Sequence, residues 1–206
     1  MDLCPRAFEK IIAELERRPV EFNRYRKGAG AGNSQTFGIV KRRFEPQGSM
    51  YGYASNCYKR PYLYKLILDF VRGYSQQIPP FNSIQLNQNY ACLPHMDKGN
   101  IGSSTVIAFG DYTGGELVMG GEAIDVRNRF ITADFSTIMH SVKPILTGNR
   151  YSMVFFTSPI AVELPPPSVR FEDGKWFFYR GAEKVYYDKW KNSTQYKNNQ
   201  MKKTLL

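Results

Sequence analysis

Two histidines and one aspartate are the residues of this sequence best suited to bind a metal ion. His95 and Asp97 stand two positions apart in PHMDKGN, and the only other histidine, His140, lies in STIMHSV. On a β-strand or directly after one, residues i and i+2 point the same way, so His95 and Asp97 can face one ion. His140 would complete the set from a neighbouring strand. An H-x-D sequence also arises by chance, so coincidence stays open on these residues alone.

The donor set predicts a particular kind of metal chemistry. Two imidazoles and one carboxylate on one face of an ion leave three coordination positions open, which is typical of non-haem Fe(II) oxygenases. Open positions let a cosubstrate and O2 bind the same ion, whereas a closed four-ligand zinc site does not. We therefore expect a redox-active iron site.

Arg150, ten residues after His140, is the candidate binder of an anionic cosubstrate. Chain reversal through KPILTGN would place it on the strand adjacent to His140, with Arg150 and Ser152 both pointing inward. A buried arginine is costly without an anion, and its guanidinium can bind a carboxylate through two hydrogen bonds. A dicarboxylate fits, and the Ser152 hydroxyl would assist. The alternative is a surface arginine at the start of a hairpin strand.

The elements that must position these residues follow from hydrophobic periodicity. Apolar residues at helical spacing predict helices within 5–19 and 60–77. From residue 83, short β-branched and aromatic runs alternate with turn residues, which is typical of a sandwich or jelly roll. The predicted strands are Ser83–Tyr90, Thr105–Gly110, Glu116–Met119, Ala123–Asp125, Phe130–Ala133, Ile138–Val142 and Arg150–Thr157. YTGGE predicts a tight turn, and VRFEDGKWFFYR a hairpin around Asp173 and Gly174.

We expect a single domain over residues 1–206, because this length supports one sizeable core. Its expected parts are a helical N-terminal support (1–82), a β core (83–160), a C-terminal hairpin (161–190) and a basic flexible tail (191–206). The glycine-rich stretch YRKGAGAGNSQ lacks a GKT or GKS ending, so we interpret it as a connector rather than a phosphate-binding loop.

Composition bears on partners and location. The chain carries 28 Lys and Arg against 18 Asp and Glu, a formal net charge of +10. This excess favours a polyanionic binding partner such as nucleic acid, although a soluble protein from a basic proteome would carry a similar net charge. Cys4, Cys57 and Cys92 show no CxxC spacing, which suits a reducing compartment. Without a membrane-length apolar run or a secretory signal pattern, we expect an intracellular protein, nuclear or cytoplasmic.

The pattern His95-x-Asp97, then His140, then Arg150-x-Ser152 resembles the 2-oxoglutarate- and Fe(II)-dependent dioxygenases over about residues 83–157. The resemblance implies a mainly β fold with flanking helices (α+β), a distorted double-stranded β-helix or jelly roll. It implies Fe(II) and 2-oxoglutarate as cofactors. It also implies that His95, Asp97 and His140 bind the iron, and that Arg150 with Ser152 binds 2-oxoglutarate.

Further contacts are expected beside these residues. Some relatives place a cosubstrate contact of N-x-Y form before the triad, where this chain reads Gln88-Asn89-Tyr90. Asn89 and Tyr90 should face opposite sides, so at most one reaches the cosubstrate. We favour Tyr90, with a core tyrosine as the alternative. Lys98 and Asn100 follow the triad and are candidate substrate contacts at the pocket mouth.

The strings HMDKGNIGSSTVIAFGDYTGGELVM and HSVKPILTGNRYSMVFF are similar to the TET/JBP branch, which oxidises 5-methylpyrimidine bases in nucleic acid. The likeness implies 5-methylcytosine or thymine in DNA as the substrate, flipped out of the duplex to reach the iron. Candidate phosphate-binding segments are 25–32, 41–47, 127–130 and the lysine-rich tail, each with an ordinary solvated charge run as the alternative. Tyr51 and Tyr53 are candidate stacking residues, with aromatic packing as the alternative.

Three alternatives stay open. GGEL also occurs in prolyl-hydroxylase-like enzymes, so the same chemistry could act on a protein side chain or a small metabolite. Some relatives use an ascorbate-type cosubstrate in place of 2-oxoglutarate. The third alternative is a basic β-sandwich that binds nucleic acid without catalysis and whose triad is coincidental. The sequence does not specify protein partners.

Overall fold

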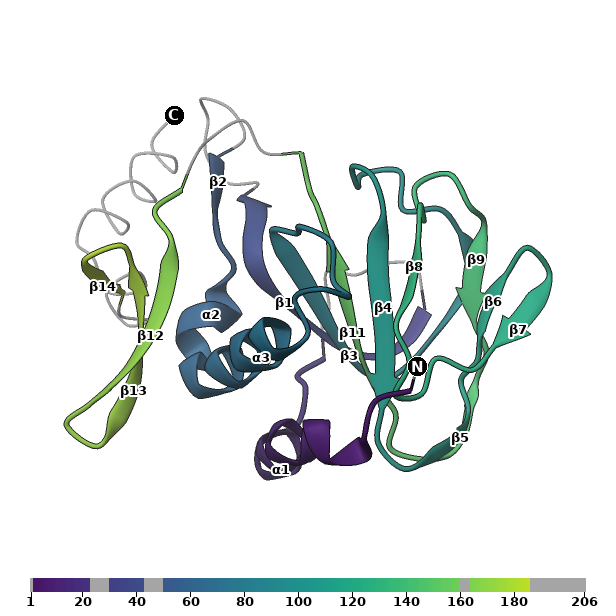
Figure 1. The fold of residues 1–206 in the computed structure, drawn as a ribbon, viewed down its shortest axis with the longest axis horizontal. Coiled ribbons are helices and arrows are strands. Elements are labelled where there is room, and N and C mark those ends of the chain that lie inside the picture. The colour runs from purple at the N-terminus through teal and green to yellow at the C-terminus, as the bar shows by residue number, and fades with distance from the viewer. Residues whose placement is uncertain (1, 23–29, 43–49, 160–163, 186–206) are drawn as a thin grey trace, which may run out of the picture.

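The fold is built on one large curled antiparallel sheet (Figure 1). The computed structural model describes residues 2–22, 30–42, 50–159 and 164–185. The nine-stranded sheet has the order β7-β6-β9-β3-β11-β4-β8, and β1 and β2 join it through β3. The bounds are β1 Gly30–Arg42, β2 Met50–Tyr53, β3 Ser83–His95, β4 Ser104–Phe109, β6 Leu117–Met119, β7 Glu122–Ile124, β8 Ile131–Ala133, β9 His140–Val142 and β11 Tyr151–Phe156. A separate pair is formed by β5 (Tyr112–Gly114) and β10 (Ile145–Gly148).

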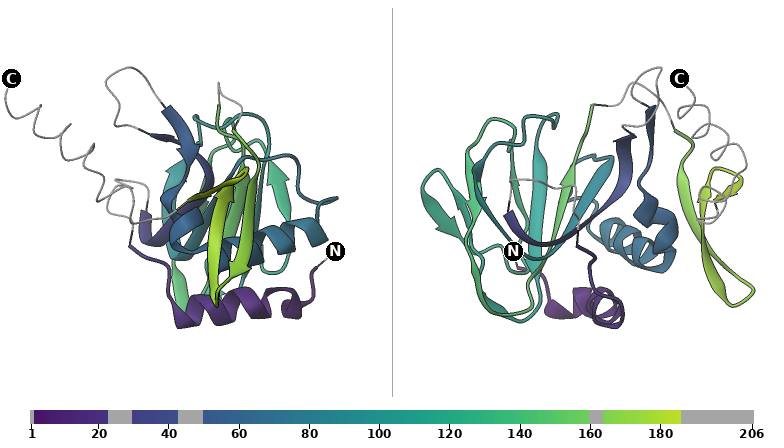
Figure 2. Two further views of the ribbon diagram at one scale, coloured as in Figure 1. Left: turned by 90° about the vertical axis from the view of Figure 1, so that its left-hand side faces the viewer. Right: turned by 180° about the vertical axis from the view of Figure 1, so that it is seen from behind.

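Helices cover one side of this sheet. A 3-10 turn (Pro5–Phe8) leads into α1 (Glu9–Arg17), and α2 (Ser55–Lys59) precedes α3 (Pro61–Gly73). Proline opens both the turn and α3, where its missing N–H would have no intrahelical partner. Figures 1 and 2 show α2 and α3 between the main sheet and the C-terminal hairpin. Helix α2 contacts β1 and β13, and α3 contacts β12 and β13 and reaches β1 through the stacked rings of Tyr64 and Phe37. Among the described helices, none has the length and apolar character to cross a bilayer.

Two hydrophobic clusters fill the molecule. In the larger one, Phe8 stacks on Phe109 of β4 with centroids 4.4 Å apart and lies 5.0 Å from the ring of Phe70 in α3. This contact fixes the N-terminal segment to both helix and sheet. The smaller cluster consists of Val106, Ala108, Tyr112, Leu117, Val126 and Phe135. Several of its members line the cavity described below, so the site is formed against an apolar wall.

The expected class, mainly β with flanking helices, is confirmed. Each predicted strand is present, and most ends agree within two residues; β3 is the exception, since it continues to His95. The C-terminal hairpin is confirmed as β12 (Pro167–Glu172) and β13 (Lys175–Arg180), with β14 (Glu183–Val185) added. Asp173 and Gly174 take φ of 49° and 75° at its turn, where asparagine, aspartate and glycine are favoured.

The description of residues 1–82 as a helical support is incomplete, because that region also contributes β1 and β2. Within the glycine-rich stretch expected to be a connector, residues 30–35 are strand and pair with β3; residues 25–29 lie outside the described part. Glycine and alanine carry little side-chain pattern, so the pairing partner rather than local propensity decides this strand. The basic tail 191–206 lies wholly outside the described residues.

The expectation that Arg150 starts the strand next to His140 is also wrong. Residues 145–148 form β10, which pairs with β5, and the strand after Arg150, β11, pairs with β3 and β4. The long strand β3 therefore lies between β9 and β11. YTGGE does not form a tight turn alone, since its first three residues are β5.

Candidate metal centre

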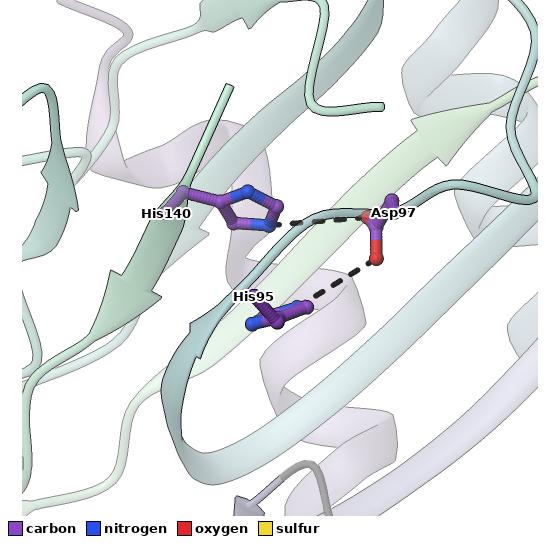
Figure 3. Close-up of side chains that lie close together, drawn as sticks. All are labelled: His95, Asp97 and His140. Atoms are coloured by element: carbon purple, nitrogen blue, oxygen red, sulfur yellow. Dashed lines mark ion pairs between the residues drawn. The ribbon is translucent and has the colours of Figure 1, made fainter. Parts of the chain in front are cut away.

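His95, Asp97 and His140 meet at one point (Figure 3). The Nε2 atom of His95 lies 3.6 Å from Oδ1 of Asp97, and Nε2 of His140 lies 3.9 Å from Oδ2 of the same carboxylate. One potential ligand atom from each residue lies within 4.8 Å of the others. His95 ends β3 and His140 begins β9, and the two residues are cross-strand partners. A register irregularity between Cys92 and His95 sets this pairing.

Backbone carbonyls orient both imidazole rings. Nδ1 of His95 lies 2.8 Å from the carbonyl oxygen of Leu93, and Nδ1 of His140 lies 3.0 Å from that of Ile138. A carbonyl can only accept, so each Nδ1 carries a proton, and in the neutral imidazole each Nε2 has its lone pair free. Metal-bound histidines are oriented by such contacts in the same way. The three free donor atoms thus suit a divalent transition metal.

The loop after β3 is held in place around Asp97. Its backbone N–H donates to the carbonyl of Phe135 over 2.8 Å, and its own carbonyl accepts from the N–H of Asn100 over 2.9 Å. The ring of Phe135 also packs against the ring of His140, with centroids 4.7 Å apart. Phe135 therefore links the two chain segments that carry the triad.

One side of the triad is open to solvent and the other faces a cavity of about 70 Å³. The side chain of Asp97 is 33 % exposed, whereas that of His140 is 9 % exposed. The cavity is lined by Asn87, Tyr90, Cys92, His95, Asp97, Val106, Leu117, Phe135, His140, Val142, Arg150, Ser152 and Val154. Polar groups converge here within an otherwise apolar wall, which is typical of a small-ligand site.

Arg150 is the most conspicuous polar group in this cavity wall. It is 2 % exposed, and among the described residues no carboxylate lies within ion-pairing distance of it. Its Nε is buried without a hydrogen-bond partner in the described part of the chain. Burial lowers the pKa of the Arg150 guanidinium below 12.5, because desolvation disfavours its charged form. An unpaired buried cation is costly, so this arrangement calls for an anion in the cavity.

Ser152 and Tyr90 line the same cavity as Arg150. Ser152 of β11 stands opposite Asn87 of β3, whose Nδ2 donates to the Ser152 Oγ over 3.3 Å. Asn89 takes φ of 49° and is absent from the cavity wall; its Oδ1 accepts from the backbone N–H of Arg150 over 2.7 Å. Asn89 therefore holds the chain at Arg150, while Tyr90 faces inward.

The candidate substrate contacts are placed differently. Lys98 is exposed, Asn100 is partly buried, and neither lines the cavity. The Nδ2 of Asn100 instead reaches the Oγ of Ser104 at 3.5 Å. Tyr53 is a core residue, buried and hydrogen-bonded to the carbonyl of Pro165, so of its two interpretations the structure supports aromatic packing over stacking on a base.

Among the basic segments, Arg127 is tied down locally. Its guanidinium lies 4.2 Å from the ring of Tyr112 and donates to the Tyr112 carbonyl over 2.6 Å. It is therefore a packing residue of the β5 region. Residues 25–29, 43–47 and 191–206 lie outside the described residues.

Sequence reasoning missed three residues that surround Arg150 and the triad. Tyr112 lies beneath Arg150, with 5.7 Å between the guanidinium carbon and the ring centroid, and its hydroxyl is buried. Gly115 packs against the stem of Arg150, and Phe135 packs against His140. Only the string GDYTGGEL pointed to this region, and it indicated a family likeness rather than these contacts.

No protein-family model matches the sequence, and a search of curated proteins finds no match either. Solved structures do match. The chain is similar to NgTET1 in complex with 5mC DNA, with TM-score 0.51 and 15 % identity over 76 % of this chain and 69 % of the other. It is less similar to a Pseudomonas putida prolyl-4-hydroxylase, with TM-score 0.46 and 17 % identity over 76 % of this chain and 89 % of the other. The chain thus has the predicted fold, a distorted double-stranded β-helix flanked by helices, of the kind seen in NgTET1.

Proposed function

We propose that this protein is an Fe(II)- and 2-oxoglutarate-dependent dioxygenase that oxidises the methyl group of 5-methylpyrimidine bases, 5-methylcytosine or thymine, in DNA. The observation that carries the proposal is the convergence of His95, Asp97 and His140 on one cavity that also contains the buried cation of Arg150. A chance cluster of metal-binding side chains would not require an unpaired arginine beside it.

In this proposal His95 and His140 bind Fe(II) through Nε2, and Asp97 binds it through one carboxylate oxygen. The fit rests on the donor set, because both rings turn Nδ1 to a backbone carbonyl and Nε2 to the carboxylate. Two nitrogen donors and one oxygen donor suit Fe(II) and leave positions open for other ligands. The partial exposure of Asp97 leaves a route by which a substrate can approach.

Arg150 binds the distal carboxylate of 2-oxoglutarate, with Ser152 assisting through its hydroxyl and Tyr90 as a further contact. The carboxylate would compensate for the desolvation of the guanidinium and satisfy its buried Nε. With both groups bound, the site would supply the oxidation of a C–H bond coupled to decarboxylation of 2-oxoglutarate. The apolar side chains of Val106, Leu117 and Val154 exclude water from the reacting groups.

The DNA substrate rests on charge and on the likeness to a DNA-bound structure. The net charge of +10 favours a polyanion, and NgTET1 was solved in complex with 5mC DNA. A base must leave the stack to approach a triad set against a cavity. Lys98, exposed beside Asp97, and Asn100 are the proposed contacts to the DNA around that base.

The test is nucleoside mass spectrometry after purified protein is incubated with Fe(II), methylated DNA and either 2-oxoglutarate or ascorbate. We expect an oxidised 5-methylpyrimidine with 2-oxoglutarate, and none with the variant Asp97→Asn. Oxidised base formed with ascorbate alone would mean that the protein uses an ascorbate-type cosubstrate in place of 2-oxoglutarate. Succinate release on another substrate without any modified base would overturn the DNA assignment and keep the chemistry.

A second candidate keeps the chemistry but replaces DNA by a protein side chain or a small metabolite. Its specific support is apolar exposure next to the triad: Leu93 is 74 % exposed and Met139 is 51 % exposed. Leu93 supplies the carbonyl that orients His95, and Met139 directly precedes His140. Such side chains suit an apolar partner better than phosphates. Activity that is insensitive to salt, without DNA affinity, would favour this candidate.

A further inference from the structure

Gly115 stands closer to Arg150 than any residue with a side chain could. A Cβ added at Gly115 would lie 2.6 Å from Cδ and 2.9 Å from Nε of Arg150, and 3.3 Å from Cγ1 of Ile145. Gly115 also has φ of +71°, and its N–H donates to the carbonyl of Pro144 over 3.0 Å. The contact is therefore between a fixed backbone and the stem of the buried arginine.

Arg150 has little freedom to yield to such a contact. Its side chain is almost fully enclosed, and the ring of Tyr112 lies 5.7 Å from the guanidinium carbon. The backbone of Arg150 is tied to Asn89 on both sides, since its N–H donates to Oδ1 and its carbonyl accepts from the Asn89 N–H. The cavity offers open space to the arginine, because Arg150 lines it and Gly115 does not.

We propose that Gly115 is a positioning residue that sets how far the Arg150 guanidinium reaches into the cavity, and so determines the length of the dicarboxylate that the site accepts. The inference rests on the proposed function, in which Arg150 binds the distal carboxylate of 2-oxoglutarate. A methyl group at position 115 presses on the arginine stem from outside the cavity. The guanidinium then moves inward, which shortens the space for 2-oxoglutarate.

The experiment is calorimetric titration of the anaerobic Fe(II)-loaded protein with 2-oxoglutarate and with oxaloacetate, which is one methylene shorter. For Gly115→Ala we expect the affinity for 2-oxoglutarate to fall by about tenfold or more. The two hydrogen bonds between a guanidinium and a carboxylate form only when the two groups are correctly placed. Oxaloacetate should lose less affinity, so the ratio of the two affinities shifts towards the shorter acid. Fe(II) content should not change.

Gly120→Ala is the matched control. Gly120 also has a positive φ, +62°, but an added Cβ would meet nothing within 4 Å. This variant carries the same kind of backbone strain without the contact, and it should leave the preference between the two acids unchanged. Equal weakening of both acids by Gly115→Ala, or binding like that of Gly120→Ala, would overturn the proposal. Failure of the wild-type protein to bind 2-oxoglutarate would instead overturn the proposed function, and this inference with it.

A double-mutant cycle keeps the inference testable if Gly115→Ala is poorly folded. The Tm should fall by about 2–8 °C for Gly120→Ala and by more for Gly115→Ala. Combining Gly115→Ala with Arg150→Ala removes Cδ and Nε, so most of the excess fall should disappear in that background, and only the 3.3 Å approach to Cγ1 of Ile145 remains. An excess that persists without the arginine stem would show that Gly115 is needed for another reason.

Discussion

His95 and His140 are partners across the antiparallel pair of β3 and β9, with their ring centroids 4.4 Å apart. Each ring is held by the carbonyl of the residue two positions earlier, Leu93 or Ile138. The same hydrogen bond from ring to carbonyl thus orients the histidine on both strands. Sheet pairing brings the two histidines together, and Asp97 adds the third donor from the loop that follows β3.

Replacing His140 by alanine should abolish stoichiometric Fe(II) binding. His140 is the most buried donor of the set, and two donors hold a divalent ion far less tightly than three. Iron content after anaerobic loading measures the effect. Thr137→Ala, at an exposed position three residues before β9, is the control and should bind iron normally. Unchanged iron in His140→Ala would support the non-catalytic β-sandwich.

Arg150→Lys should raise the KM for 2-oxoglutarate by about tenfold or more while iron binding persists. Lysine keeps the positive charge but cannot offer two parallel donors to one carboxylate. Steady-state succinate production and iron content separate the two effects. Arg129→Lys, at an exposed arginine, should change neither. A loss of iron in Arg150→Lys would mean that the arginine supports the fold of the triad instead.

Phe135→Leu should weaken Fe(II) affinity by roughly tenfold, the lower end of the effect of residues that orient metal ligands. The aromatic ring packs on His140, and leucine fills less of that space. The backbone hydrogen bond from Asp97 to the Phe135 carbonyl is kept, so the loop should stay folded. A competitive chelator titration gives the affinity, and Phe171→Leu, at an exposed phenylalanine, is the comparison. Equal affinity in both variants would rule out this role.

Alkaline pH should destabilise the protein through Cys57. Burial raises the pKa of its thiol from 9.0 to about 12. Between those values the folded state keeps a proton that the unfolded state loses, so the free energy of unfolding falls as pH rises above about 9. Urea denaturation at a series of pH values should show this decline. Cys57→Ala should show a shallower decline, and an identical slope in both proteins would contradict the assignment.

Removal of residues 191–206 should weaken DNA binding and its dependence on salt. This segment has four lysines and no aspartate or glutamate. If all four contact phosphates, the slope of log affinity against log salt should fall in magnitude by about 3–4. Fluorescence anisotropy with labelled duplex DNA measures both quantities. A slope unchanged by the truncation would mean that phosphate contacts lie elsewhere on the chain.

The sequence by itself determined the donor types, their local spacing and much of the secondary structure. His95 and Asp97 can face one ion because side chains alternate between the two faces of an extended chain, which is a local property of the backbone. The helices begin at Pro5 and Pro61, and the hairpin turns at Asp173 and Gly174, for equally local reasons. These features depend only on neighbouring residues.

Only the tertiary structure decided which distant segments meet. The placement of β3 between β9 and β11, the pairing of the glycine-rich β1 with β3, and the approach of Gly115 to Arg150 all depend on long-range packing. Strand pairing carries weak local signals, since its energy comes from neighbours across the sheet. The cavity around Arg150 arises for the same reason: its walls come from strands that no local pattern could have assigned to one another.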